Sequence, residues 1–219
     1  MTEPDLELEL VDGWVERELG EEFPELSLLH ARLDVRPTRS PPEVRHRLRM
    51  LADRYTGGKV VHMRQDPVPW AYRVFSRQVG IDPDHDRTPV EAVALRRLKH
   101  GGLHSENLVD DALTIAIAET GVPLIALDAE RVEGELGLRL AREGERLDGS
   151  RPLFDRQLVV ADSERPVAVV LGDVSQDAGV TPETERMTVC ALGVKGVPRI
   201  SLEEALWSAA ETLYTDASA

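Results

Sequence analysis

The stretch from 107 to 149, NLVDDALTIAIAETGVPLIALDAERVEGELGLRLAREGERLDG, decides the fold. Its first part is apolar on most sides, which predicts a buried helix over 106–120. Gly121 suits the left-handed residue that ends a helix, and Pro123 prevents the helix from continuing. The remainder alternates short apolar runs with glycine turns, which predicts two short strands, over 124–127 and 136–140.

The flanking sequence extends this pattern in both directions. Hydrophobic periodicity predicts further helices over 43–55, 69–79, 88–99 and 201–214. Alternating or continuous apolar runs predict further strands over 6–11, 26–35, 157–161, 167–171 and 187–192. Helices and strands mixed in this way, without repeats or a low-complexity linker, predict an α+β fold.

Several residues mark the expected helix ends. Thr88, Pro89 and Glu91 combine an N-cap, a proline at the first position and a glutamate three residues after the cap, which is the pattern of a capping box. Ser105 and Ser201 are expected to cap the helices that begin at about 106 and 201. The pair Gly57-Gly58 is expected to end the helix over 43–55.

Composition and charge narrow the class of protein. The chain has 219 residues, of which 42% are hydrophobic, so we expect one domain over 1–219 with a substantial core. The net charge of −14 argues against DNA binding and against general RNA binding, which need a basic surface. One cysteine, Cys190, allows no disulfide framework. An acidic N-terminus and the absence of a long apolar run predict a cytoplasmic protein without a membrane span.

Three motifs in the opening stretch match a known module in order and spacing. They correspond to a VDxTN-like helix segment, a GxPxHxFD-like turn and an RxAxxGExLxxLDG-like segment. The matching residues are Val109 and Asp110; Gly121, Pro123 and Asp128; and Arg139, Ala141, Gly144, Glu145, Leu147 and Gly149. The chain therefore resembles the B3/B4 domain of bacterial phenylalanyl-tRNA synthetase beta subunits, the module that hydrolyses mischarged tyrosyl-tRNA.

The resemblance continues outside these motifs. Short segments at 160–162, 166–173 and 180–184 look like the strands and turns of the B4 part, and the sequence around Trp70 to Arg97 looks like the helical region of free-standing B3/B4 proteins. It implies an α+β B3/B4 fold, a mixed sheet wrapped by helices. We expect N-terminal strands and a helix over about 1–64, the core of the resemblance over 65–192 and a C-terminal helix over 200–215.

Departures from the family pattern fall where the family handles its substrate. The family's Thr-Asn pair falls at Ala112 and Leu113, and its histidine falls at Ile125. The glutamate associated with recognising the tyrosine hydroxyl falls near Cys190, and a glycine of the MGG turn falls at Asp173. A site without these polar groups cannot select a phenol by hydrogen bonding. We therefore expect a specificity other than tyrosyl-tRNA.

The resemblance and the local sequence together indicate candidate site residues. The substrate-binding candidates are Asp110, Arg139, Gly172, Asp173 and Thr184. The candidates for tRNA contact are Arg96 and Arg97. The family reaction is ester hydrolysis by a positioned water with oxyanion stabilisation, which needs no catalytic triad. No catalytic residue, metal or cofactor is predicted.

Each candidate has a structural alternative. Asp173 could orient water or an amine, or accept hydrogen bonds from its own turn. Asp110 could bind substrate or favour the helix dipole. Arg139 could contact substrate or brace the Gly144 turn through Glu145.

Two reactive residue types have alternatives as well. Cys190 could be a nucleophile or a packed core thiol. The histidines of His100-Gly-Gly-Leu-His104 superficially suggest a metal site, but the glycines break the helix that would align them and no third ligand is fixed by spacing. We therefore favour packing for Cys190 and expect no metal.

Two functional hypotheses follow. The first is a free-standing B3/B4 protein that binds an aminoacyl group on tRNA and acts as a deacylase in trans. The second is a non-catalytic module that binds an amino-acid-like small molecule or a protein partner. A complete synthetase subunit is not expected, because 219 residues leave no room for its catalytic core and anticodon-binding domain.

Overall fold

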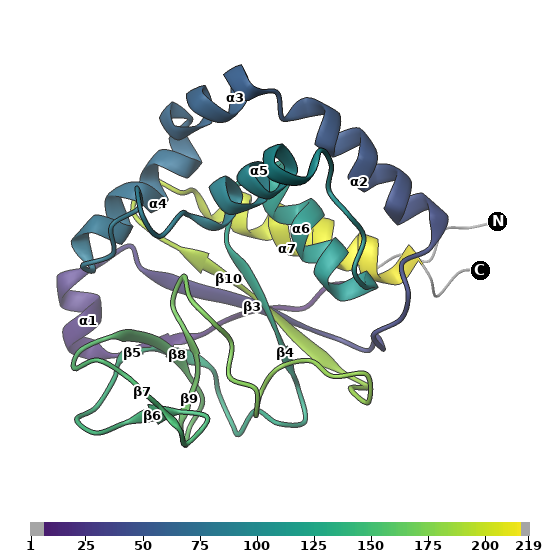
Figure 1. The fold of residues 1–219 in the computed structure, drawn as a ribbon. Coiled ribbons are helices and arrows are strands. Elements are labelled where there is room, and N and C mark those ends of the chain that lie inside the picture. Colours follow the sequence, from purple (N-terminus) through teal and green to yellow (C-terminus); the bar gives the residue numbers. More distant parts are fainter. Residues whose placement is uncertain (1–6, 216–219) are drawn as a thin grey trace.

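A four-stranded antiparallel sheet runs through the middle of the molecule (Figure 1). The computed structural model describes residues 7–215. The strand order is β1, β3, β10 and β4, which span Leu10–Asp12, Ser27–Leu33, Met187–Gly193 and Leu124–Asp128. The longest register joins β3 to β10, so segments far apart in sequence form the centre of this sheet.

A second four-stranded sheet packs below the first in Figure 1. Its order is β2, β5, β8 and β9, which span Trp14–Val15, Gly137–Leu140, Leu158–Ala161 and Pro166–Val169. Strands β2 and β5 are parallel, and the other neighbours are antiparallel. A two-stranded ribbon lies beside this sheet and consists of β6, Arg146–Leu147, and β7, Arg151–Pro152.

Helices cover the upper face of the first sheet in Figure 1. Helices α6, Leu108–Thr120, and α7, Arg199–Tyr214, contact the strands, while α2, Pro42–Arg54, and α5, Pro89–His100, pack on α6. The shorter or more peripheral helices are α1, Arg17–Glu22; α3, Gly57–His62; a 3₁₀ turn η1, Met63–Gln65; and α4, Pro67–Gln78. In the part of the chain that the structure describes, none of the helices has the length and hydropathy of a transmembrane span.

The first sheet has a buried cluster on each face. One joins the sheet to α2, α5, α6 and α7, and in it Ile115 and Ala116 of α6 are fully buried. The other joins the sheet to the second sheet through residues such as Cys190 and Val160. The α+β class predicted from the sequence is thus confirmed, with the strands divided between two stacked sheets.

Helix α6 is confirmed as a buried helix, but its N-cap is not the expected residue. The side chain of Asn107 accepts a hydrogen bond from the N–H of Asp110 at 2.9 Å, so Asn107 is the cap. Ser105 instead donates to the buried carboxylate of Asp111 at 2.5 Å. Gly121 ends the helix with φ of +77°, as predicted.

Other helix ends also differ from the prediction. Gly57-Gly58 begin α3 rather than end α2, because the hydroxyl of Thr56 accepts from the N–H of Lys59 at 3.4 Å and caps a new helix. Helix α7 has Pro198 as its N-cap, so Ser201 lies inside the first turn rather than at the cap. The capping box that begins α5 is confirmed.

Strand lengths were overestimated in places. The strand predicted over 6–11 appears as β1 from Leu10, and Leu6 lies outside the described residues. The strand predicted over 26–35 is shorter by a residue or two at each end. The sequence did not predict α1, α3, β2 or the β6–β7 ribbon, all of which are too short to show a periodic pattern.

Candidate functional site

A small apolar cavity of about 100 Å³ lies between the two sheets. Register places Ile125 of β4 opposite Cys190 of β10, so their side chains project from the same face of the sheet into the cavity. Of the residues that the structure places around it, none carries a charge. The other lining residues are Leu28, Pro89, Pro123, Leu124, Val160, Val169, Val170, Leu171, Gly172 and Leu192.

Cys190 contributes packing rather than a nucleophile to this cavity. Its side chain is 1% exposed, and burial raises the pKa of its thiol to about 12. A thiol with that pKa is protonated at neutral pH, whereas nucleophilic attack needs the thiolate. The packing interpretation drawn from the apolar strand is therefore the one the structure supports.

One wall of the cavity is a tight turn after β9. The N–H of Gly172 donates to the carbonyl of Val169 at 3.0 Å. A Cβ at Gly172 would lie 2.9 Å from Val169 Cγ1, so a larger residue would push the turn open. Leu171 has φ of +57°, a strained conformation for a residue other than glycine.

A larger groove of about 550 Å³ shares this turn with the small cavity. The turn from Val169 to Gly172 lines both spaces. The opposite side of the groove comes from the end of α4 and the loop after it, and from the segment around Phe154. The charged residues in its lining are Asp86, Arg151, Asp155 and Arg156.

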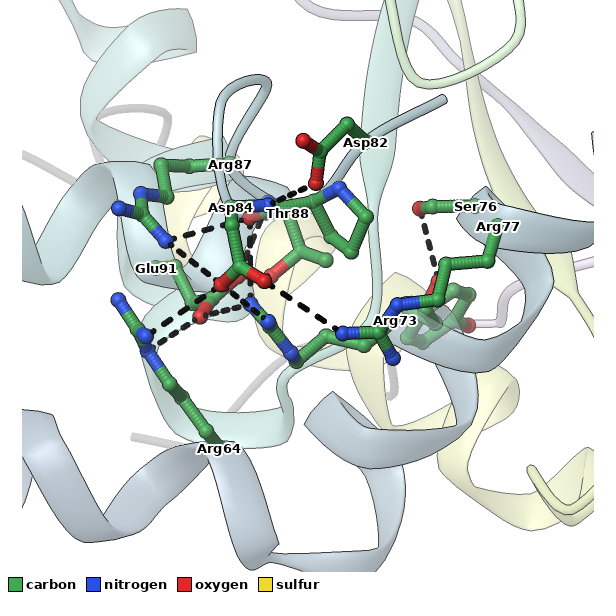
Figure 2. A network of polar contacts seen from close by, with 11 residues as sticks. Arg64, Arg73, Ser76, Arg77, Asp82, Asp84, Arg87, Thr88 and Glu91 are labelled. Atoms are coloured by element: carbon green, nitrogen blue, oxygen red, sulfur yellow. Dashed lines mark hydrogen bonds and ion pairs between the residues drawn. The ribbon is translucent and has the colours of Figure 1, made fainter. Parts of the chain in front are cut away.

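A buried ion pair fixes the loop that borders both spaces (Figure 2). Arg73 of α4 donates to Glu91 of α5 at 2.8 Å, and their side chains are only 5% and 3% exposed. Arg73 also donates to the carbonyl of Pro83 at 3.2 Å. Glu91 accepts from Arg64 at 2.9 Å and from both the N–H and the hydroxyl of Thr88, so the pair and the helix cap share one carboxylate.

Asp84 lies on the exposed side of this network. Figure 2 shows its carboxylate with arginines around it, of which Arg73 is nearest at 2.6 Å. Arg64, Arg77 and Arg87 lie 3.6, 3.6 and 3.4 Å away. The hydrogen bond from Arg73 and the surrounding guanidinium charges lower the pKa of Asp84. The network thereby holds the segment between α4 and α5, which supplies groove residues and leads directly into Pro89 of the cavity wall.

Gly172 is the sequence-predicted site residue that lines the cavity itself. Asp173 follows it, is exposed, and forms an ion pair with Arg151 at the edge of the groove. Arg96 and Arg97 lie on α5 away from both spaces: Arg96 donates to Thr114, and Arg97 donates to a backbone carbonyl of α2. Their assignment as tRNA contacts stays a prediction.

The remaining predicted site residues have local structural partners. Asp110 is exposed at the start of α6 and accepts from the amide of Asn107 at 2.5 Å. Thr184 is buried and donates to Asp128 at 2.7 Å, which ties the segment before β10 to the end of β4. Neither residue lines the small cavity, although Asp110 lines a separate surface hollow.

Arg139 forms a two-pronged ion pair with Glu145, with N–O distances of 2.7 and 2.6 Å. This pair braces the turn at Gly144, which has φ of +74°. The hydrogen bonds from Arg139, helped by the N–H of Arg142, lower the pKa of Glu145 below its usual value of 4.5. The carboxylate is therefore favoured in the folded protein over its protonated form.

This lowered pKa makes the stability of the protein pH-dependent. The ionised Glu145 contributes to the free energy of unfolding, and this contribution is complete above the pKa that Glu145 has in the unfolded chain. It is lost as the pH falls through the lower pKa that Glu145 has in the folded protein. We expect the Tm to decline below about pH 4.5. Glu145→Gln should have a lower Tm near neutrality and a shallower decline in acid, because glutamine takes up no proton. Thermal unfolding between pH 3 and 7 checks this, with Glu185→Gln, which removes an exposed carboxylate, as the matched control.

Sequence reasoning missed the residues that line the larger groove. Arg151, Phe154 and Arg156 belong to a short loop and ribbon with no recognisable motif. The available signal was Phe154 itself, one of three phenylalanines in a chain with 4% aromatic residues, placed in a charged segment.

The histidines His100 and His104 lie with ring centroids 6.5 Å apart, and within residues 7–215 no group of three or more metal-ligating side chains is found.

Comparison with known proteins places this geometry in a family. Residues 71–212 match the B3/4 domain, so the chain belongs to the B3/4 domain family. A phenylalanine–tRNA ligase beta subunit from Streptomyces avermitilis is 33% identical over 114 residues, which is 48% of this chain and 13% of that protein. The corresponding subunit from Gloeobacter violaceus is 37% identical over 112 residues, which is 44% of this chain and 14% of that protein. The chain thus covers a small part of the length of these relatives.

Proposed function

We propose that this protein is a deacylase that acts in trans on mischarged aminoacyl-tRNA carrying an apolar amino acid. The observation that carries the proposal is the apolar cavity of about 100 Å³ in a B3/4 domain, lined by Ile125 and Cys190. These are positions at which the resemblance places residues that handle the substrate. The cytoplasm, where aminoacyl-tRNA is used, is the proposed location.

The lining of the cavity favours an aliphatic side chain over a phenol. A hydrogen-bonding side chain is needed to select the tyrosine hydroxyl, and Ile125 and Cys190 supply neither a charge nor an ionised acceptor. A volume of about 100 Å³ is also smaller than the cavity of about 150 Å³ known to hold benzene in another protein. We therefore assign the cavity to a small aliphatic side chain.

The proposed reaction is hydrolysis of the ester between the amino acid and the terminal ribose. A water oxygen attacks the ester carbonyl, the carbon–oxygen bond to the ribose breaks, and the ribose oxygen takes up a proton, so the products are the free amino acid and tRNA. Backbone N–H groups can stabilise the intermediate oxyanion. Alternation along β4 points the N–H of the cavity-lining residue Leu124 away from β10, so this N–H is not used in the pairing of β4 with β10, and we propose it as a candidate donor.

Deacylation assays with purified protein test the proposal. The substrates are tRNAs charged or mischarged with valine, isoleucine, leucine, phenylalanine and tyrosine, and the measurement is release of the labelled amino acid. Faster release of one aliphatic amino acid than of tyrosine supports the proposal. Specific release of tyrosine contradicts the assigned specificity, and no release above the uncatalysed rate from any substrate contradicts the proposed activity.

Asp173→Ala tests the exposed carboxylate beside the cavity. Asp173 is 72% exposed in its side chain and pairs only with the exposed Arg151, so we expect the free energy of unfolding to change by less than about 1 kcal/mol. We expect hydrolysis to change, because the residue adjoins the Gly172 turn. Unfolding in urea and deacylation rates measure the two effects separately, and an unchanged rate removes Asp173 from the site.

The second candidate function is a non-catalytic module that binds an amino-acid-like ligand. The apolar side-chain lining of the cavity favours it, because no charged side chain lies there to activate water and the Cys190 thiol is protonated at neutral pH. A rise in Tm with free aliphatic amino acids or their amides, together with no deacylation, supports this module over the deacylase.

A further inference from the structure

The larger groove adjoins the apolar cavity but has a different chemical character. The turn from Val169 to Gly172 lines both, so the two spaces lie on either side of one short segment. The groove has a volume of about 550 Å³, against about 100 Å³ for the cavity. That volume suits a small-molecule ligand or one nucleotide rather than a second amino-acid side chain.

Phe154 presents an open aromatic face to this groove. It is 80% exposed, the highest value among the large hydrophobic residues of the described chain. The other two phenylalanines, Phe23 and Phe75, pack edge to face on each other at 5.7 Å. An exposed ring in a ligand-sized groove is a platform on which a nucleic-acid base can stack.

The charges in the groove are mixed rather than uniformly basic. Arg151 and Arg156 have side chains that are 50% and 63% exposed, and their carboxylate partners, Asp173 and Glu22, lie at the surface. The groove also contains the carboxylates of Asp86 and Asp155. Arginine recognises phosphate, while carboxylates accept hydrogen bonds from ribose hydroxyls. This set fits one nucleotide better than a run of phosphates.

Backbone strain in the groove is concentrated at two lining residues. Arg156 and Leu171 both have φ of +57° and both line the groove, and they are two of three non-glycine residues with positive φ in residues 7–215. Glycine would adopt this conformation at lower cost. Strain retained at non-glycine residues is consistent with a use for their side chains.

We propose that this groove binds the 3′-terminal nucleotide of the tRNA, with its base stacked on Phe154 and its phosphate held by Arg151 and Arg156. The ribose then lies beside the turn from Val169 to Gly172, and the ester-linked amino acid reaches past that turn into the apolar cavity. This inference rests on the proposed function, because it takes the cavity as the site of the amino-acid side chain.

Isothermal titration calorimetry with adenosine 5′-monophosphate and with an RNA oligonucleotide ending in CCA tests the site. We expect both probes to bind wild-type protein, and Phe154→Ala to weaken binding by about 10-fold or more, the effect typical of one stacked base. Phe154→Tyr keeps the ring and should retain binding. Trp70→Ala, which removes an exposed aromatic residue outside the groove, is the matched control and should bind as wild type.

The probes also distinguish an RNA end from a free nucleotide. Tighter binding of the oligonucleotide, with both probes dependent on Phe154, supports the RNA end. Binding of the mononucleotide alone indicates a free-nucleotide site and overturns the proposal, as does failure of both probes to bind or equal binding by wild type and Phe154→Ala.

Deacylation rates separate this inference from the proposed function. If aminoacyl-tRNA is hydrolysed and Phe154→Ala leaves both kcat and KM unchanged, the groove assignment fails while the deacylase stands. If no aminoacyl-tRNA is hydrolysed but the oligonucleotide binds in a Phe154-dependent way, the deacylase fails while the nucleotide site stands.

Discussion

Glu91→Leu is expected to lower the free energy of unfolding by about 3–5 kcal/mol, the cost of breaking a buried ion pair by removing one partner. Glu91 is 3% exposed in its side chain and accepts hydrogen bonds or ion pairs from Arg64, Arg73 and Thr88. Its loss leaves the buried guanidinium of Arg73 without its buried partner and also removes the glutamate of the capping box of α5. Urea unfolding measures the change, and the Tm should fall by about 10 °C.

Further variants identify the cause of this loss. Arg73→Met should lower the free energy of unfolding by less than Glu91→Leu does, because Arg64 still pairs with the carboxylate of Glu91. The double variant Arg73→Met/Glu91→Leu should lose less free energy of unfolding than the two single variants lose in sum, because no buried charge is then left without its partner. Arg17→Met removes an exposed pair and should change stability little. Additive losses would contradict direct coupling between Arg73 and Glu91.

Ile125→Trp is expected to reduce deacylation by about 100-fold, because the larger side chain fills the apolar cavity and displaces the amino acid from its productive position. Ile125 is half-buried and lines the cavity, so the protein can accommodate part of the added volume at its exposed side. We expect a loss of stability of no more than about 1–3 kcal/mol. Single-turnover deacylation and urea unfolding, measured on the same preparation, separate the two effects.

A matched change away from the cavity controls for this variant. Leu98→Trp enlarges an exposed hydrophobic residue on α5 that does not line the cavity, and it should leave hydrolysis unchanged. Ile125→Val keeps the cavity open and should retain most of the rate. Wild-type hydrolysis by a folded Ile125→Trp protein would show that the aminoacyl group binds elsewhere.

The fold could be predicted where the sequence carries strong local signals. The apolar helix over 106–120 and the capping box at Thr88 were both recognised, because periodicity and capping are local properties. The N-cap of α6 was misassigned because Ser105 and Asn107 are both good capping residues. A contact with Asp111, which depends on the folded chain, decides between them.

The candidate site was only partly predictable, for a different reason. The resemblance identified Ile125, Cys190 and Gly172 as positions of interest, and the structure brings these together around one cavity. The groove residues Arg151 and Phe154 come from a two-residue strand and a loop that become neighbours of the Gly172 turn only when β8 pairs with β9 and the β6–β7 ribbon packs beside them. No spacing rule in a single sequence encodes that proximity.

The position of β10 in the chain has a consequence for synthesis on the ribosome. This strand spans Met187–Gly193 and lies between β3 and β4, which do not pair with each other. Until it has emerged, the first sheet lacks the strand that joins its two halves, and the apolar edges of β3 and β4 remain open to other chains. The nascent protein therefore completes its central sheet only when residues 187–193 have emerged, well after β3 and β4 have been translated.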